Sequence, residues 1–240
     1  MRAVVMQPTY LPWMGYFGMI DLADLFICYD DVQFVRRSWQ QRNRIKIAEG
    51  KWIWLSVPVI HESGQKINQV RVDKTRNWRK KHWQSIFHAY SKTPFFRHVG
   101  DEVEPLYQRE WELISDLNLS AILKLCELLN IKIPRILRSS NIEGLRGQRT
   151  ERLLNLLEIV GANEYIANPG SSTYLEVDKF RERGIRVLWY EYQHPVYPQI
   201  RGSFMPYMSA IDVLFNTGMQ AIRFVREGSQ HALQLDERTG

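Results

Sequence analysis

The sequence has few cysteines, no long hydrophobic run and no recognisable leader. Its two cysteines, Cys28 and Cys126, both lie in apolar stretches. Two thiols placed in this way favour a reduced protein over a disulfide scaffold. No apolar stretch approaches the roughly 20 residues that span a bilayer. Residues 1–10 carry one charge and an early proline, which is not the pattern of a signal peptide. We therefore expect a cytoplasmic protein that does not insert into membranes.

Common catalytic and phosphate-binding motifs are also missing. There is no Walker lysine motif and no G-x-G-x-x-G, which excludes a typical P-loop NTPase or dinucleotide site. There is no G-x-S-x-G nucleophile turn. No cysteine and histidine cluster has zinc spacing, and His82 and His88 stand six apart, so they share a helix face poorly. The cysteines and histidines therefore predict no metal site.

The net charge of +6 is moderate, and the positive residues gather in two runs, 36–51 and 71–82. Three explanations compete for them: nucleic acid, an anionic small ligand such as a nucleotide, and an ordinary solvated surface. For the run 71–82, an ordinary solvated surface explains the charges as well as a ligand does. Run 36–46 follows directly on a predicted strand end, which favours a ligand there.

Apolar spacing and turn residues predict an α/β protein. Predicted strands are residues 1–6, 25–29, 51–60, 133–137, 164–167 and 185–192. Predicted helices are residues 17–24, 77–90, 102–129, 150–160 (stopped by Gly161), 171–183 and 208–216. The alternation predicts a Rossmann-like, HUP-type parallel sheet of about five strands with helices on both faces. We expect a single domain over residues 1–240. Its core is formed by residues 1–37 and 131–226, a mixed α+β insertion over 38–130 caps the site, and residues 227–240 form a polar tail.

The turn over residues 7–16 is unusually rich in aromatic side chains for a strand-to-helix connection. Ligands of doubly wound sheets bind beyond the carboxyl ends of the strands, where this turn lies. Aromatic rings there can stack on a base or a sugar, and Gly15 lets the backbone approach a phosphate. Packing is the competing explanation. The predicted binding residues of this turn are Gln7, Tyr10, Trp13, Gly15 and Tyr16.

Polar residues also follow two later strands. Asp30 and Asp31 end the second strand and are suited to hold a ribose hydroxyl or Mg²⁺ or to act as a base, although only one of them should face the site. His194 follows the last strand and can act as general acid or base near neutral pH. A local turn and a backbone hydrogen bond are the competing explanations. We expect Asp31 and His194 to be catalytic. The remaining expected contacts are Asp30, Gln33, Arg37, Arg42, Asn43, Lys46, Tyr197 and Gln199, with Arg37, Arg42 and Lys46 neutralising a pyrophosphate.

Four long blocks carry a family resemblance: QPTYLPWMGYF, DDVQFVRRSWQQRNRIK, TERLLNLLEIVGANEYI and HPVYPQIRGSFMPYMSAIDVLFNTG. They resemble the signature blocks of the WbqC-like proteins. The resemblance implies a bacterial protein associated with O-antigen, lipopolysaccharide or other surface-polysaccharide and sugar-modification pathways. It implies no particular mechanism.

The opening PTYLPWMGYFGMIDLADLFICYDDVQF is similar in layout to the HxGH nucleotidyltransferases of the pantothenate-synthetase type. Gly15 matches their motif, but Trp13 and Tyr16 stand where the two histidines would be. Neither can supply an imidazole's cationic donor to a phosphate. This second resemblance therefore implies the fold and a nucleotide-shaped crevice, and it does not imply nucleotidyl transfer.

Together these features predict a transferase acting on a nucleotide-activated substrate. The expected ligand is a nucleotide-linked amino sugar or its acyl or aminoacyl donor, and the candidate cofactors are a nucleotide or Mg²⁺. One alternative is a nucleic-acid-binding protein that uses the basic, tryptophan-containing insertion. The other is a non-catalytic nucleotide-binding relative of the nucleotidyltransferases.

Overall fold

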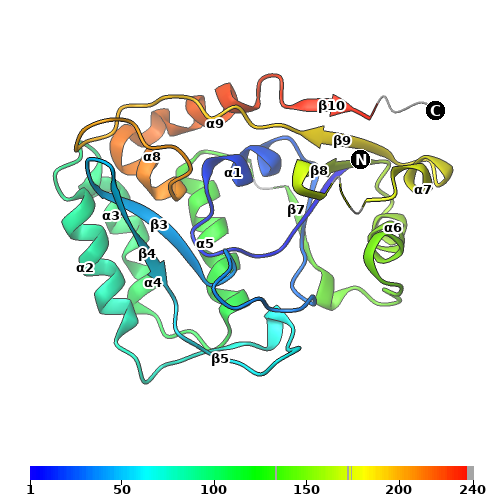
Figure 1. Cartoon of the computed structure of the whole chain (residues 1–240), viewed down its shortest axis with the longest axis horizontal. Helices are drawn as coiled ribbons and strands as arrows, with labels where there is room; N and C mark the ends of the chain where they lie inside the picture. Colours follow the sequence, from blue (N-terminus) through cyan, green and yellow to red (C-terminus); the bar gives the residue numbers. More distant parts are fainter. Residues whose placement is uncertain (133, 172, 174, 237–240) are drawn as a thin grey trace.

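The computed structural model describes residues 1–132, 134–171, 173 and 175–236, and a six-stranded sheet runs through it (Figure 1). The strands stand in the order β10-β9-β8-β1-β2-β7. Every neighbouring pair is parallel except β10 with β9. The chain order reverses between the central strands β1 and β8. The strands are β1 (Arg2–Met6), β2 (Leu25–Cys28), β7 (Arg135–Arg138), β8 (Glu164–Ala167), β9 (Arg186–Tyr190) and β10 (Leu233–Leu235).

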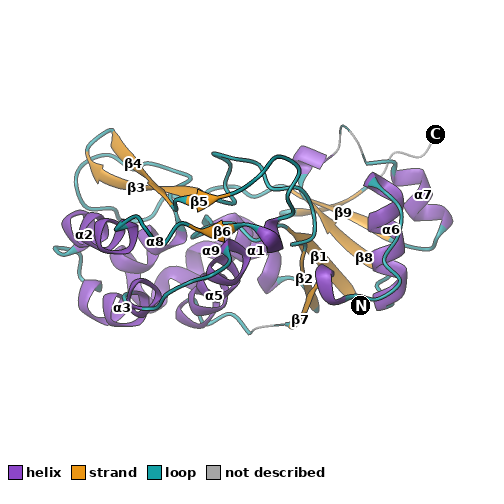
Figure 2. Ribbon diagram, turned by 90° about the horizontal axis from the view of Figure 1, so that it is seen from below, coloured by secondary structure: helices purple, strands orange, loops and turns teal. Residues whose placement is uncertain are grey.

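Helices cover both faces of this sheet, as the sequence predicts (Figure 2). Strand side chains alternate between the faces. Ala3 and Leu25 join one buried cluster, whereas their neighbours Val4 and Phe26 join the other. The first cluster lies under α6 (Arg149–Val160) and α7 (Val177–Glu182). The second lies under α1 (Met14–Asp21), α5 (Ile114–Leu128), α8 (Ala210–Thr217) and α9 (Ala221–Ser229).

The long connection from β2 to β7 contains two small sheets and several helices. The sheets pair β3 (Arg42–Ala48) with β4 (Lys51–Ser56) and β5 (Val59–Ile60) with β6 (Arg71–Val72). The helices are α2 (Trp78–Tyr90), α3 (Phe96–Val103), α4 (Pro105–Gln108) and α5. Ile45, Ile86 and Leu117 belong to the same buried cluster as Phe26 of the main sheet. This connection is therefore packed onto the sheet through one continuous core.

Two predicted elements are interrupted in the structure. The helix expected over 102–129 is divided among the end of α3, α4 and α5, because Pro105 has no N–H to continue the helical hydrogen bonds and starts a new helix instead. The strand expected over 51–60 divides before Pro58 into β4 and β5. The helix expected over 171–183 shortens to α7, and of its earlier positions residues 172 and 174 lie outside the described residues.

The carboxyl-terminal part is more structured than a polar tail. α9 continues to Ser229, and β10 then pairs antiparallel with β9, with Leu233 opposite Tyr190. Pairing satisfies backbone groups that β9 would otherwise expose as an edge strand. The sheet thus gains a strand that the sequence did not predict. The last residues of the expected tail, 237–240, lie outside the described residues.

Both cysteines are free and buried, and burial raises the pKa of each thiol to about 12. Neither is therefore an activated nucleophile. None of the helices in the described part of the chain is both long and apolar enough to cross a membrane.

Candidate functional site

A cavity of about 1160 Å³ opens where the strand order reverses. Val5 and Met6 of β1 line it, together with Tyr165 and Ile166 of β8. The start of α6 forms a further part of its wall, through Gln148, Arg149 and Thr150. Ligands of open α/β sheets bind in this position, and the volume accommodates a ligand larger than a single sugar.

Aromatic side chains form the rim on the side of the first turn. Trp13, Tyr16, Trp39 and Tyr207 all line the cavity. The ring of Trp13 packs edge-on against Tyr192, with centroids 5.2 Å apart, and tilts against Tyr207 at 5.6 Å. A methyl group at Gly15 would overlap the indole of Trp13. Gly15 therefore shapes the cavity by letting Trp13 lie on the first turn of α1.

Positive charge comes from several separate elements. The basic side chains that line the cavity are Arg44, Lys66, Arg149 and Arg152. Two of them belong to the first turn of α6, whose N-cap residue Gln148 makes no side-chain capping hydrogen bond. Helix N-termini carry partial positive charge and unpaired amides. The electrostatics of this wall therefore favour an anionic ligand.

Asp31 is the one acidic side chain among the described residues that line the cavity. It forms an ion pair with Arg152 of α6 and accepts a hydrogen bond of 2.6 Å from the Ser139 hydroxyl. The Asp31 side chain is 10% exposed. The pair thereby joins the end of β2 to the first turns of α6 at the cavity wall.

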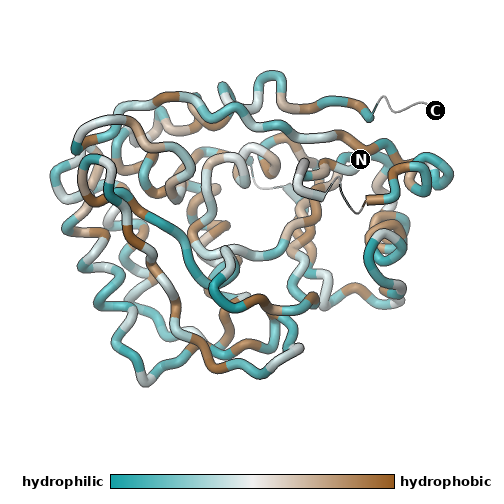
Figure 3. Tube along the Cα trace, in the orientation of Figure 1, coloured by the Kyte–Doolittle hydropathy of each residue, from teal (hydrophilic) through white to brown (hydrophobic). Residues whose placement is uncertain are grey.

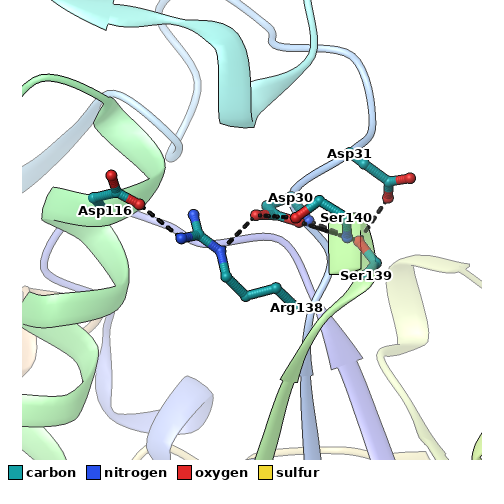
Figure 4. A network of polar contacts seen from close by, with 6 residues as sticks. All are labelled: Asp30, Asp31, Asp116, Arg138, Ser139 and Ser140. Atoms are coloured by element: carbon teal, nitrogen blue, oxygen red, sulfur yellow. Dashed lines mark hydrogen bonds and ion pairs between the residues drawn. The ribbon is translucent and has the colours of Figure 1, made fainter. Parts of the chain in front are cut away.

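Asp30 points the other way and is fully buried (Figure 4). Its carboxylate accepts hydrogen bonds from Arg138 Nε at 2.8 Å and from the backbone N–H and hydroxyl of Ser140, both at 3.1 Å. The Nη1 of Arg138 also forms an ion pair with Asp116 on α5, at 2.7 Å. Asp30 thus ties β2 to β7 and does not line the cavity. This division agrees with the expectation that only one aspartate faces the site.

His194 lies behind the rim. Its ring is nearly parallel to that of Trp13, at a centroid distance of 6.4 Å, and it also contacts Tyr207 at 5.2 Å. Its Nδ1 is 3.0 Å from the Pro195 carbonyl, and its Nε2 is buried with no hydrogen-bond partner among the described residues. Burial lowers the pKa of His194, so the ring is neutral at pH 7. His194 is not among the residues that line the cavity.

Six of the predicted site residues line the cavity: Gln7, Trp13, Tyr16, Asp31, Gln33 and Asn43. Several others make internal contacts instead. The Tyr10 hydroxyl is shared with His82 and Tyr107, and the Lys46 ammonium donates to the carbonyl of Ser203 at 2.6 Å. Tyr197 and Gln199 both donate to the buried Asp212, at 2.8 and 2.9 Å.

The two remaining arginines also lie outside the cavity. The guanidinium of Arg42 lies 4.1 Å from the ring centre of Trp54. Arg37 is exposed and has a left-handed backbone, with φ of 59°. Arg42, Lys46 and the 197–199 segment therefore act first as supports for the hairpin β3–β4 and the loop before α8.

The contribution of α6 to the cavity wall is not among the predicted features. Arg149 and Arg152 lie there because a helix that follows a parallel strand places its N-terminus beside the strand ends. That signal was present, but the pattern alone does not say which helix adjoins the cavity. Among the described residues, no three histidine, cysteine or acidic side chains gather in a way that could hold a metal ion.

Comparisons with known proteins give one family and one curated relative. The model of the WbqC-like protein family matches residues 7–224. The chain is 37% identical over 228 residues to Rv1507c, an uncharacterized protein of Mycobacterium tuberculosis, and the match covers 94% of this chain and 97% of that protein. No solved structure matches the chain.

Proposed function

The chain belongs to the WbqC-like protein family, and from this premise we propose that it is a transferase whose cavity binds a nucleotide-linked substrate. The observation that carries the proposal is the position of the cavity at the reversal of strand order, beside the start of α6. Ligands of open, mostly parallel sheets bind at the point where the strand order reverses, and this supports the proposal.

The phosphates of the ligand would lie against α6. Its uncapped N-terminus and Arg149 offer N–H donors and positive charge to an anion. Arg149 is exposed and no ion pair engages it within the described residues, whereas Arg152 is held by Asp31. Arg149 is therefore the arginine of α6 that is free to contact a pyrophosphate.

The ring-bearing parts of the ligand would lie against the aromatic rim. Trp13, Trp39 and Tyr207 offer faces and edges for a base or a sugar, and Gln7 and Gln33 add exposed amides. Asp31 would take the proton that an attacking amine or hydroxyl loses, since it is the acidic side chain among the described residues that line the cavity. We assign His194 to positioning Trp13, because it stacks behind that ring and does not reach the cavity lining.

This activity suits a nucleotide-linked amino sugar, or its acyl or aminoacyl donor, in surface-polysaccharide or O-antigen biosynthesis. Such a reaction would take place in the cytoplasm, where two free buried thiols are stable. The pathway assignment follows from the family alone.

Ligand-induced stabilisation tests the proposal. A nucleotide or nucleotide sugar present at about 100 times its dissociation constant should add about 2.7 kcal/mol to the free energy of unfolding. Arg149→Gln should weaken that binding by about 1.5–3 kcal/mol, because a charge-assisted hydrogen bond is lost. Arg146→Gln is the matched control, since Arg146 is exposed three residues earlier and does not line the cavity.

A screen of nucleotides and nucleotide sugars with no stabilisation of the wild-type chain would refute the binding proposal. If Arg149→Gln and Arg146→Gln bind the ligand with equal affinity, the proposal that its phosphates lie against α6 is wrong. The Asp31→Asn variant should bind the ligand as the wild type does but should no longer catalyse group transfer. Unchanged turnover in that variant would remove Asp31 as the base.

A further inference from the structure

The two basic runs of the chain differ in how their charges are balanced. In the run 71–82, Arg71 and Lys74 both pair with Glu112, and Arg79 pairs with Glu110. Arg76 lies 3.5 Å from Asp73. Four of the six lysines and arginines in this run are therefore paired with carboxylates of the same molecule.

The run 36–51 is not balanced in this way. Within the part of the chain that the structure describes, five of its cations form no ion pair: Arg36, Arg37, Arg42, Arg44 and Lys51. Figure 3 shows the hydrophilic character of the trace as it enters β3. Lys46, the remaining cation of the run, is buried and donates to loop oxygens. The exposed charge of this segment is available to an external partner.

Exposed tryptophans share this surface. Trp39 is 48% exposed and Trp52 is 39% exposed. Trp54 lies between them, with ring centres 5.3 Å from Trp39 and 5.2 Å from Trp52. A cluster of three indoles with two of them exposed forms an apolar patch of the kind that marks an interaction surface.

The hairpin register explains how arginines and tryptophans come together. Arg44 is opposite Trp54, and Arg42 and Arg44 fall on the same face because strand side chains alternate. The guanidinium of Arg42 lies 4.1 Å from the centre of Trp54, and that of Arg44 lies 5.5 Å from Trp52. The opposite face of the hairpin, with Ile45 and Leu55, is buried in the core. We call Arg36, Arg37, Trp39, Arg42, Arg44, Trp52 and Trp54 the Trp–Arg surface.

We propose that the Trp–Arg surface binds single-stranded nucleic acid. Unpaired cations contact phosphates, and exposed indoles supply stacking faces for bases, which is the combination that single-strand binders use. Arg42 and Arg44 lie over the rings of Trp54 and Trp52, and a guanidinium stacked on an indole keeps its full positive charge for a phosphate. An apolar protein partner fits less well, because it would desolvate arginines that have no carboxylate to pair with.

This inference goes beyond the proposed function and does not depend on it. Trp39 and Arg44 also line the cavity, so the Trp–Arg surface reaches the cavity mouth. A strand held on the surface is therefore placed to direct its terminal nucleotide towards the cavity. Trp52, Arg36 and Arg37 lie outside the cavity lining and can be changed without altering it.

Fluorescence anisotropy with a labelled single-stranded oligouridylate, and with its oligothymidylate counterpart, tests the inference on the full chain. Binding should weaken steeply between about 50 and 200 mM salt, as expected for phosphate contacts. Trp52→Ala should weaken binding by between about fivefold and a hundredfold through the loss of one stacking platform.

Charge variants provide the matched control. Arg36→Gln with Arg37→Gln should reduce affinity at least tenfold and make the salt dependence shallower by about 0.7 per lost phosphate contact. Lys80→Gln with Lys81→Gln removes the same charge from the exposed face of the other basic run and should leave affinity unchanged. Thermal unfolding of all variants checks that each is folded.

Several outcomes would overturn the inference. The first is the absence of oligonucleotide binding at about 50 mM salt. The second is an affinity of Trp52→Ala equal to that of the wild type, and the third is an equal loss of affinity in the two double charge variants. Tighter binding to heparin or to anionic vesicles than to the oligonucleotide would assign the surface to a different polyanion. Nucleotide-sugar stabilisation is measured in parallel, and it should survive Trp52→Ala. Loss of one activity without the other therefore shows which proposal has failed.

Discussion

Gly15 and Trp13 share the start of α1, and their contact shapes the aromatic rim of the cavity. In an ordinary helix position, replacing glycine with alanine stabilises the protein by about 0.5–1 kcal/mol. At Gly15 the added methyl group would overlap the indole of Trp13. Overlap in a packed site costs more than the helix gains.

We therefore predict that Gly15→Ala lowers the free energy of unfolding by about 1–3 kcal/mol and abolishes stabilisation by nucleotides. Gly100→Ala is the control, since it lies within helix α3 and its methyl group would meet Trp83 at an ordinary 3.5 Å. That variant should gain up to about 1 kcal/mol. Urea unfolding measures both, and a Gly15 variant as stable as the Gly100 variant would contradict this account.

Helix α2 is joined to the N-terminal turn through a buried polar cluster. His82 contacts the Tyr10 hydroxyl at 3.0 Å, and that hydroxyl lies 2.8 Å from the hydroxyl of Tyr107 on α4. Burial lowers the pKa of His82 to about 4, compared with about 6.5 for an exposed histidine. The ring is therefore neutral in the folded chain over the range in which the unfolded chain binds a proton.

This difference predicts a pH dependence of folding. The unfolded chain protonates this histidine at a higher pH than the folded chain does. The contribution of neutral His82 to the free energy of unfolding is therefore fully present above about pH 6.5 and decreases as the pH falls towards 4. The loss amounts to about 3 kcal/mol between pH 7 and pH 4. His82→Leu should remove this part of the pH profile. His88→Leu, an exposed change on the same helix, should retain it. Parallel profiles for wild type and His82→Leu would refute the prediction.

At the scale of the whole molecule, one buried cluster extends from the main sheet into the connection between β2 and β7. A shared core makes separate unfolding of the connection unfavourable, because either part alone would expose its apolar side of the contact. Six of the eight tryptophans lie between residues 38 and 130, so tryptophan fluorescence reports mainly on that connection.

We predict a single cooperative unfolding transition. The midpoints from tryptophan fluorescence and from far-ultraviolet circular dichroism should coincide in a urea titration. A fluorescence transition at clearly lower urea would show that the connection unfolds on its own, and would favour an independent insertion. The Trp52→Ala variant serves as a control for signal from the exposed hairpin, which should not shift the midpoint.

Local sequence patterns determined most of the secondary structure. The strand ends at Met6 and Ala167 and the helix end at Val160 lie where the patterns predict them, and Gly161 takes the expected left-handed backbone, with φ of 72°. These features depend on short-range physics: alternation, helical spacing and the freedom of glycine. The aromatic turn and the polar strand end were visible in the same way, and Gln7, Trp13, Tyr16 and Asp31 from these two segments line the cavity.

Only the tertiary structure decided how those segments are used. Asp30 and Asp31 are adjacent and chemically equal, yet β7 buries one and the cavity receives the other. Arg149 reaches the site because α6 packs beside β1 and β8, and Lys46 leaves it because the 199–203 loop binds its ammonium. A side chain's neighbours depend on strand order and on contacts between residues distant in the chain. No local pattern encodes that information, so residue type indicated the candidate side chains and the fold decided which of them line the cavity.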